Sequence, residues 1–128
     1  MESYRVQFLS KENTITIEYR GDVYYRTLLK SLDDLLKISM LNQINLILDF
    51  REVTNLCVGY HQLMNFRTGL NVLLPKRAIK KMAIINPARI PLGGTFCSTN
   101  KVVDHTVQKC DMRCFEADRT SDVYRWLS

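Results

Sequence analysis

The first part of the chain alternates between apolar and polar positions. In Thr14–Tyr19 the apolar positions are Ile15, Ile17 and Tyr19, and this two-residue period is typical of a strand with one buried face. Tyr4–Leu9 is also rich in strand-forming residues, and the turn-forming sequence Ser-Lys-Glu-Asn separates the two segments. The pattern therefore predicts a β-hairpin at the start of the chain.

Apolar residues next recur at steps of three and four, which is the spacing of one buried helix face. Asp22 is the expected N-cap of the first such segment, and Pro75 stops the second. A short helix at the end of the chain is expected to dock through Val123, Trp126 and Leu127. We therefore expect four helices, at about residues 22–41, 56–74, 95–109 and 118–127.

Residues 44–50 between these helices are almost continuously apolar, as a strand covered on both faces is. Residues 81–85 are predicted to form a second buried strand, and residues 112–116 the last strand. The resulting order ββαβαβαβα predicts an α/β fold with a mainly parallel five-stranded sheet, an N-terminal hairpin and about four helices. No repeat, linker or low-complexity segment divides the chain, so residues 1–128 are expected to form a single domain.

The composition is that of one compact domain, with 128 residues, 46% hydrophobic and 24% charged. No apolar run approaches the ~20 residues of a membrane span, and the first residues do not resemble a secretory signal. These features predict a cytoplasmic protein whose four cysteines are reduced rather than bridged. Cys97, near the start of a predicted helix, is the candidate for a reactive thiol.

The net charge of +5 is concentrated in one stretch of the sequence. Residues 67–113 hold nine Lys or Arg and two Asp or Glu, and the segments on either side are close to neutral. Such a stretch attracts anionic ligands, acidic protein surfaces or phospholipid headgroups, although the same side chains also serve simply to solvate helix ends and loops. Nucleic acid is disfavoured, because few aromatic residues are interleaved to stack on bases.

Residues capable of catalysis or metal binding do not form a recognisable site. Cys57 and His61 are four positions apart, but no Cys-x-x-Cys pair completes a zinc site. Ser98, Asp104 and His105 are the residue types of a hydrolase triad, yet Ser98 and His105 lie about two turns apart on one predicted helix. We therefore expect a protein that is not an enzyme and that uses no metal or cofactor.

The layout resembles the STAS family, the domain of anti-sigma-factor antagonists and sulphate-transporter tails, and more closely its SpoIIAA-like branch. The resemblance extends over nearly the whole chain and implies a non-enzymatic bacterial module for regulation or protein interaction. The residues that carry it are the strand and its continuation at 45–54, the helix that follows, the strand at 81–85, and Phe115-Glu116-Ala117-Asp118 before a helix containing Trp126 and Leu127.

The stretch after the central strand departs from this family's pattern. Phosphoswitch members carry an Asp-Ser-Ser-Gly-like sequence at the start of the helix, where a kinase modifies one serine. Here residues 55–60 read Asn-Leu-Cys-Val-Gly-Tyr, so the switch position has no hydroxyl to receive the phosphate charge that would repel or recruit a partner. Thr54 is nearby, and its hydroxyl is interpreted as satisfying a turn, with phosphorylation at this residue as the less favoured alternative.

The resemblance also implies which residues contact a partner. Members of the family use this helix against other proteins, so the exposed side of residues 55–67 is the expected contact surface for an anti-sigma-factor-like or sensor-like protein. Tyr60 also has the apolar spacing of a core residue, and homodimerisation is left open. The candidate partner-binding residues are Thr54, Asn55, Cys57, Tyr60, His61 and Arg67.

A basic loop at residues 86–96 is the candidate ligand site. It follows the carboxyl end of a predicted parallel strand, where ligands bind in open α/β sheets. Its glycines expose backbone N–H groups near a helix start, and Arg89 can make a forked contact with an anion. The alternative function is therefore binding of an anionic small molecule or lipid headgroup, although the segment also fits a plain strand-to-helix connection. The candidate anion-binding residues are Arg89, Gly93, Gly94 and Thr95.

Overall fold

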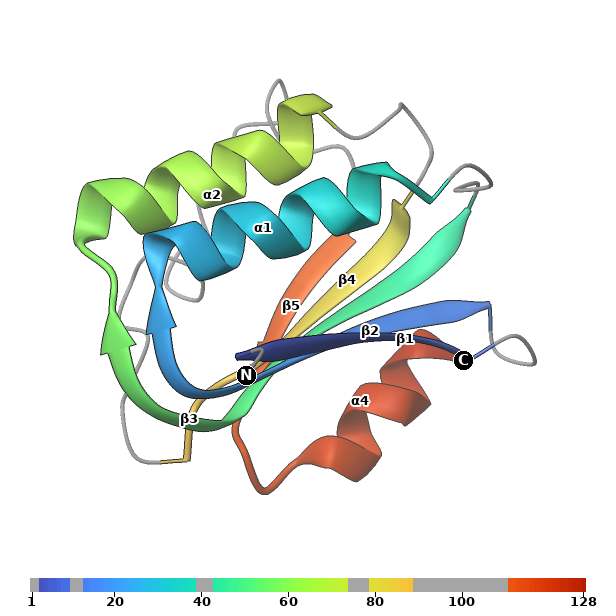
Figure 1. Cartoon of the computed structure of the whole chain (residues 1–128). Coiled ribbons are helices and arrows are strands. Elements are labelled where there is room, and N and C mark those ends of the chain that lie inside the picture. Colours follow the sequence, from blue (N-terminus) through green and yellow to red (C-terminus); the bar gives the residue numbers. More distant parts are fainter. Residues whose placement is uncertain (1–2, 10–12, 39–42, 74–78, 89–110) are drawn as a thin grey trace.

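Five strands form a single mixed sheet whose spatial order follows the chain order. The strands are β1 Tyr4–Leu9, β2 Thr14–Tyr24, β3 Ile44–Cys57, β4 Ile79–Ile85 and β5 Asp111–Phe115. The computed structural model describes residues 3–9, 13–38, 43–73, 79–88 and 111–128 (Figure 1). β1 pairs with β2 antiparallel, and the remaining neighbours pair parallel. The predicted five-stranded α/β sheet is therefore confirmed.

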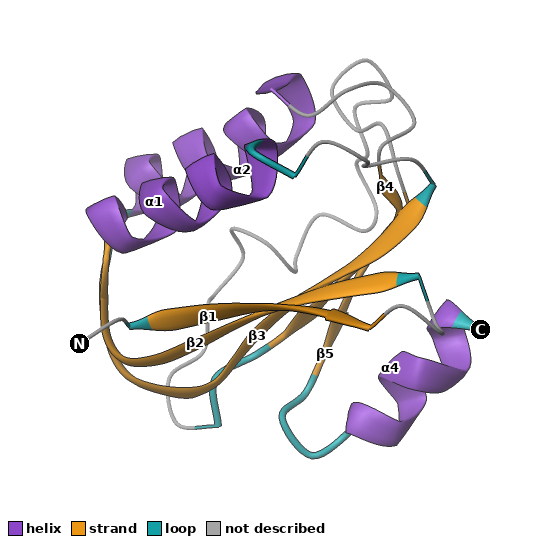
Figure 2. Cartoon of the chain, turned by 45° about the vertical axis from the view of Figure 1, so that its right-hand side comes forward, coloured by secondary structure: helices purple, strands orange, loops and turns teal. Residues whose placement is uncertain are grey.

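Helices cover the two faces of the sheet unequally. α1 (Tyr25–Leu36) and α2 (Tyr60–Leu73) lie on one face, and α4 (Thr120–Leu127) lies on the other (Figures 1 and 2). The described residues thus contain three helices rather than about four, and the helix expected at 95–109 lies outside them. None of these helices in the described part of the chain is long and apolar enough to cross a membrane.

The neighbouring strands β2 and β3 are longer than the hydrophobic pattern predicts. β2 continues past Tyr19 and β3 past Phe50, because the strands stay paired until Tyr24 lies opposite Cys57. The register shifts twice along the way, and Gly21 at one shift has a left-handed φ of 67° that disfavours a side chain. Figure 1 shows the result, with both strands curving together toward the starts of α1 and α2.

The predicted start of the first helix is therefore wrong. Asp22 lies within β2 rather than at an N-cap, and Asn55 on β3 donates from Nδ2 to its Oδ1 at 2.7 Å. Tyr24 instead precedes α1 in an extended conformation, and its backbone N–H donates to Thr27 Oγ1 at 3.2 Å. The second helix also begins later than predicted, because Leu56 still belongs to β3.

Tyr19 lies in the larger of two cores, between the sheet and the α1–α2 layer. Its ring stacks on Phe50 with centroids 4.5 Å apart. The Tyr19 hydroxyl lies 2.7 Å from Ser31 Oγ in α1, and Ser31 Oγ donates to the Leu28 carbonyl at 2.7 Å. Since Ser31 has one hydroxyl proton, Tyr19 is the donor of the pair. Burial raises the pKa of Tyr19 well above its ordinary value, which keeps this donor protonated.

A second, smaller core lies between α4 and the opposite face of the sheet. Val123 and Leu127 are buried there and Trp126 is partly buried beside them, so the predicted docking of the last helix is confirmed. Lys81 Nζ on β4 donates to the Trp126 carbonyl at 2.8 Å and lies 5.4 Å from the centroid of its ring. The sheet residues of this core are Ile47, Ala83 and Ile85.

The cysteines do not all match the expectation of reduced thiols. Cys57 is a free, exposed thiol, but Cys114 on β5 is disulfide-bonded. Cys97 and Cys110 lie outside the described residues. The expectation rested on the redox compartment, whereas pairing in a fold depends on whether two cysteines approach closely enough to bridge.

We predict that Ser31→Ala lowers the free energy of unfolding by about 1–3 kcal/mol, because it leaves the buried Tyr19 hydroxyl without its acceptor. Urea denaturation followed by circular dichroism measures this change. Adding Tyr19→Phe to Ser31→Ala should cost little more, because no buried hydroxyl is then left unpaired. Fully additive losses from the two substitutions would show that the hydroxyls do not act as a pair.

Candidate functional site

Two helix starts meet at one end of the sheet. Because β2 and β3 are parallel and stay paired as far as Tyr24 and Cys57, they deliver α1 and α2 to the same end of the molecule (Figure 1). We call the residues around this point the aromatic surface. It consists of Tyr24, Arg26, Cys57, Tyr60 and His61.

The aromatic surface is open to solvent. Tyr60 is 62% exposed and Tyr24 39% exposed, and Cys57 and His61 are exposed as well. The Tyr60 and His61 rings meet edge to face, with centroids 5.6 Å apart and an interplanar angle of 78°. The Arg26 guanidinium carbon lies 4.9 Å from the centroid of the Tyr24 ring. Each tyrosine therefore contacts a neighbour while much of its side chain stays uncovered.

The interpretation of Tyr60 as a core residue is wrong, and its position in α2 explains why. The buried face of this helix consists of Leu63, Phe66 and Leu70, which share the three- to four-residue spacing that Tyr60 continues. Tyr60, however, is the first residue of α2, where the chain has only just left β3. Helical spacing alone therefore does not indicate burial at a helix end.

Hydrogen bonds hold the connection between β3 and α2. The Gly59 backbone N–H donates to Gln62 Oε1 at 3.0 Å, and the Leu63 N–H donates to the Gly59 carbonyl at 3.0 Å. The Gln62 side chain thus reaches back to the residue before the helix, as in one half of a capping box. Together with the bond between Asn55 and Asp22, these contacts place the aromatic surface on a restrained backbone.

The other predicted partner-binding residues lie on the same two elements. Thr54 and Asn55 are exposed on β3, so the Thr54 hydroxyl is in a strand and not in the turn expected for it. Arg67 is half-buried in α2, about two turns after Tyr60. The structure therefore brings Cys57, Tyr60 and His61 together around the start of α2 and leaves Arg67 further along the helix.

Tyr24 and Arg26 are two residues of this surface that sequence reasoning misses. A helix beginning at Asp22 would contain both of them, and it would not place Tyr24 beside Cys57. The available signal is Gly21, because glycine inside a strand-like segment often marks a bulge or bend after which the strand continues.

The predicted anion-binding loop lies mainly outside the described residues. This applies to Arg89, Gly93, Gly94 and Thr95, so the site stays a prediction. The strand before the loop is in place, and the Asn86 N–H donates to the Phe115 carbonyl at 2.9 Å beyond the end of β4. In the described ranges, no three His, Cys, Asp or Glu side chains are grouped so that they could hold a metal ion.

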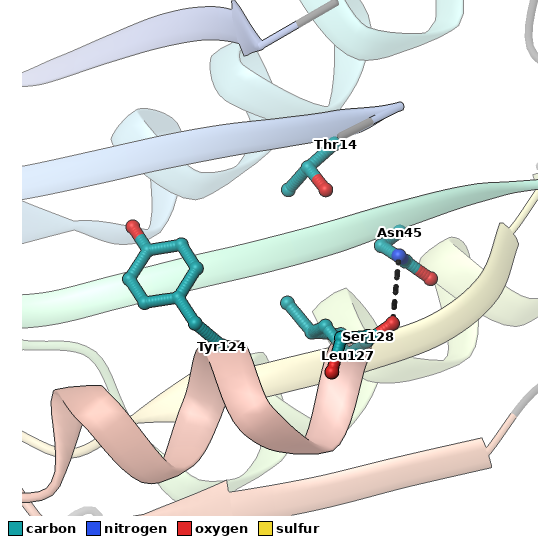
Figure 3. Close-up of a pocket in the computed structure, with 5 residues that line it drawn as sticks. All are labelled: Thr14, Asn45, Tyr124, Leu127 and Ser128. Atoms are coloured by element: carbon teal, nitrogen blue, oxygen red, sulfur yellow. Dashed lines mark hydrogen bonds between the residues drawn. The ribbon is translucent and has the colours of Figure 1, made fainter. Parts of the chain in front are cut away.

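A separate pocket lies on the opposite face of the sheet, beside α4 (Figure 3). It has a volume of about 220 Å³ and is lined by Thr14, Asn45, Tyr124, Leu127 and Ser128. Asn45 Nδ2 donates to the Leu127 carbonyl at 3.4 Å, but Asn45 Oδ1 is buried with no hydrogen-bond partner in the described part of the chain. This oxygen is closed to solvent, so it costs free energy without offering a contact to a ligand.

We predict that Asn45→Leu leaves the free energy of unfolding unchanged or raises it by up to about 1 kcal/mol, because it removes a buried unpaired oxygen and adds apolar contact. Asn45→Asp should instead lower stability, because a buried carboxylate would lack a partner. Thermal unfolding of the three proteins measures both effects. A clear loss of stability in Asn45→Leu would mean that the long bond to Leu127 is needed to hold α4.

Comparison with known proteins concerns the fold. No protein-family model and no curated protein matches the chain. Among solved structures, it is similar to an uncharacterized protein of the DUF3478 family with a SpoIIAA-like fold from Shewanella loihica PV-4. The TM-score is 0.56 at 16% sequence identity, and the similarity covers 98% of this chain and 92% of that chain. The chain therefore has a SpoIIAA-like fold, as its sequence pattern predicts.

Proposed function

We propose that this protein is a non-enzymatic regulatory module that binds another protein through the aromatic surface. The observation that carries the proposal is the exposure of Tyr24 and Tyr60 beside backbone that hydrogen bonds restrain. The SpoIIAA-like fold supports a role in regulation or interaction. The family resemblance suggests a bacterial cytoplasmic setting and an anti-sigma-factor-like or sensor-like partner.

Exposed tyrosines of this kind are sources of binding free energy. Tyr and Arg are enriched among the residues that dominate interfaces. A Tyr ring buries much area while few bonds become fixed. Tyr60 already contacts His61, and Tyr24 already contacts Arg26. These contacts restrain the rings before a partner arrives, which lowers the entropic cost of binding.

The proposed regulation does not use a phosphoserine. Residues 55–62 contain neither serine nor threonine, and Thr54 before them lies within β3. Control of binding would then come from the partner or from another part of this chain rather than from a phosphate at the start of α2.

We predict that p-benzoylphenylalanine at position 60 captures a partner protein by photo-crosslinking in the native host, and that the same residue at position 124 captures it far less. Tyr124 is a matched control, because it is a 48% exposed tyrosine on α4, across the sheet from α2. With the purified partner, Tyr60→Ala should weaken binding about tenfold or more, as removal of an aromatic anchor does.

The variants also test whether the effect is local. Tyr60 is exposed, so Tyr60→Ala should leave the thermal midpoint nearly unchanged. Capture that is equal at positions 60 and 124, or an undiminished affinity in Tyr60→Ala, would contradict the proposed surface.

A further inference from the structure

The charges around the aromatic surface indicate the chemistry of its partner. We infer that the surface binds an acidic protein segment, in which Asp or Glu accompany apolar side chains. This inference rests on the proposed function and adds the chemical class of the partner to it.

The first observation is the absence of acidic residues from both helix starts. Neither α1 nor α2 has an acidic residue in its first turn, and these turns contain Arg26 and His61 instead. A helix N-terminus carries partial positive charge, which Asp or Glu commonly offsets. Because the paired strands deliver both helix starts to one end of the sheet (Figure 1), the two partial charges add to the full charge of Arg26.

The second observation concerns the carboxylates nearest this end. Asp22 accepts a 2.7 Å hydrogen bond from Asn55, and Glu52 lies opposite Arg20 in the register of β2 and β3. After Glu52, the described residues of β3 and α2 contain no Asp or Glu. Arg20 therefore opposes the charge of Glu52, and Asp22 alone is left to oppose Arg26 and the two helix starts. Each helix start carries roughly half a positive charge, so the surface keeps an excess of positive charge.

The third observation is the way in which Arg26 is presented. Its guanidinium lies over the Tyr24 ring, and it forms no ion pair within the described part of the chain. A guanidinium stacked on a ring keeps its N–H donors in its own plane, where a carboxylate can still accept two of them. The exposed rings of Tyr24 and Tyr60 provide apolar contact beside this charge, so a partner segment with both acidic and apolar side chains is the complement.

The test uses ¹⁵N-labelled protein and two synthetic peptides of equal length. Both carry leucines at the same positions, and the remaining positions are Glu in one peptide and Lys in the other. We expect only the Glu peptide to shift the amide signals of the aromatic surface. Binding should weaken several-fold when the salt concentration rises from about 0.05 to about 0.3 M, because exposed charges are screened.

Charge-reversal variants locate the effect. Arg26→Glu should weaken binding of the Glu peptide about tenfold, because attraction becomes repulsion at the contact. Arg125→Glu is the control, because it changes the net charge equally at an 80% exposed side chain on α4, and it should alter binding less than about twofold. Both side chains are exposed, and unchanged thermal midpoints would verify that both variants fold.

Several results would overturn the inference: no shifts from the Glu peptide at millimolar concentration, equal shifts from both peptides, or an equal response to single-stranded DNA of the same charge. The proposed function, binding of another protein through the aromatic surface, is refuted by a different result from the one that refutes the acidic partner. Capture at position 60 through a partner segment without acidic residues would refute the acidic partner and retain the interaction module. An absence of any captured protein at position 60 would refute the module itself.

Discussion

The parallel pairing of β2 with β3 is the interaction on which the rest of the structure depends. It runs from Thr14 opposite Asn45 to Tyr24 opposite Cys57. Because side chains alternate between the faces of a strand, this register decides which residues of both strands face α1 and α2 and which face α4. The same register also decides where the two helices begin, since each helix starts within a few residues of the last pair. Core and aromatic surface are thus two consequences of one pairing.

The stacked rings of Tyr19 and Phe50 lie at the point where the register between β2 and β3 first shifts. Up to Glu18 the register is regular, and the first shift follows at once. Beyond the shift the strands leave the layer that α1 and α2 cover and bend toward the helix starts (Figure 1). The hydroxyl of Tyr19 on β2 donates to Ser31 in the middle of α1. The strand that leads into α1 is therefore also hydrogen-bonded to the side of that helix that faces the sheet. This hydrogen bond adds to the apolar packing of Leu28, Leu32 and Leu35 that holds α1 on the sheet.

Hydrophobic periodicity predicts the parts of this fold that have a buried face. It identifies β1 through β5, both helices of the covering layer, and the residues through which α4 docks. It does not predict the continuation of β3 past Phe50, because most side chains there are exposed on both faces of the strand and backbone pairing leaves no apolar signal. Cys57, Tyr60 and His61 are identified through the family resemblance. Tyr24 joins them only through a long-range strand pair, which local patterns do not reveal.

Because the residues of the aromatic surface are exposed, they can contact a partner without contributing to the folded core. The aromatic surface lies beyond the two cores, so a partner can contact it without disturbing buried side chains. Five residues cover much less area than a stable interface requires, and a partner would therefore extend over the neighbouring helices. The outer sides of α1 and α2 offer apolar contacts for this, at Leu29, which is 42% exposed, and Val72, which is 62% exposed. A partner that also covers these helices would bury more of its surface than one that contacts only the helix starts.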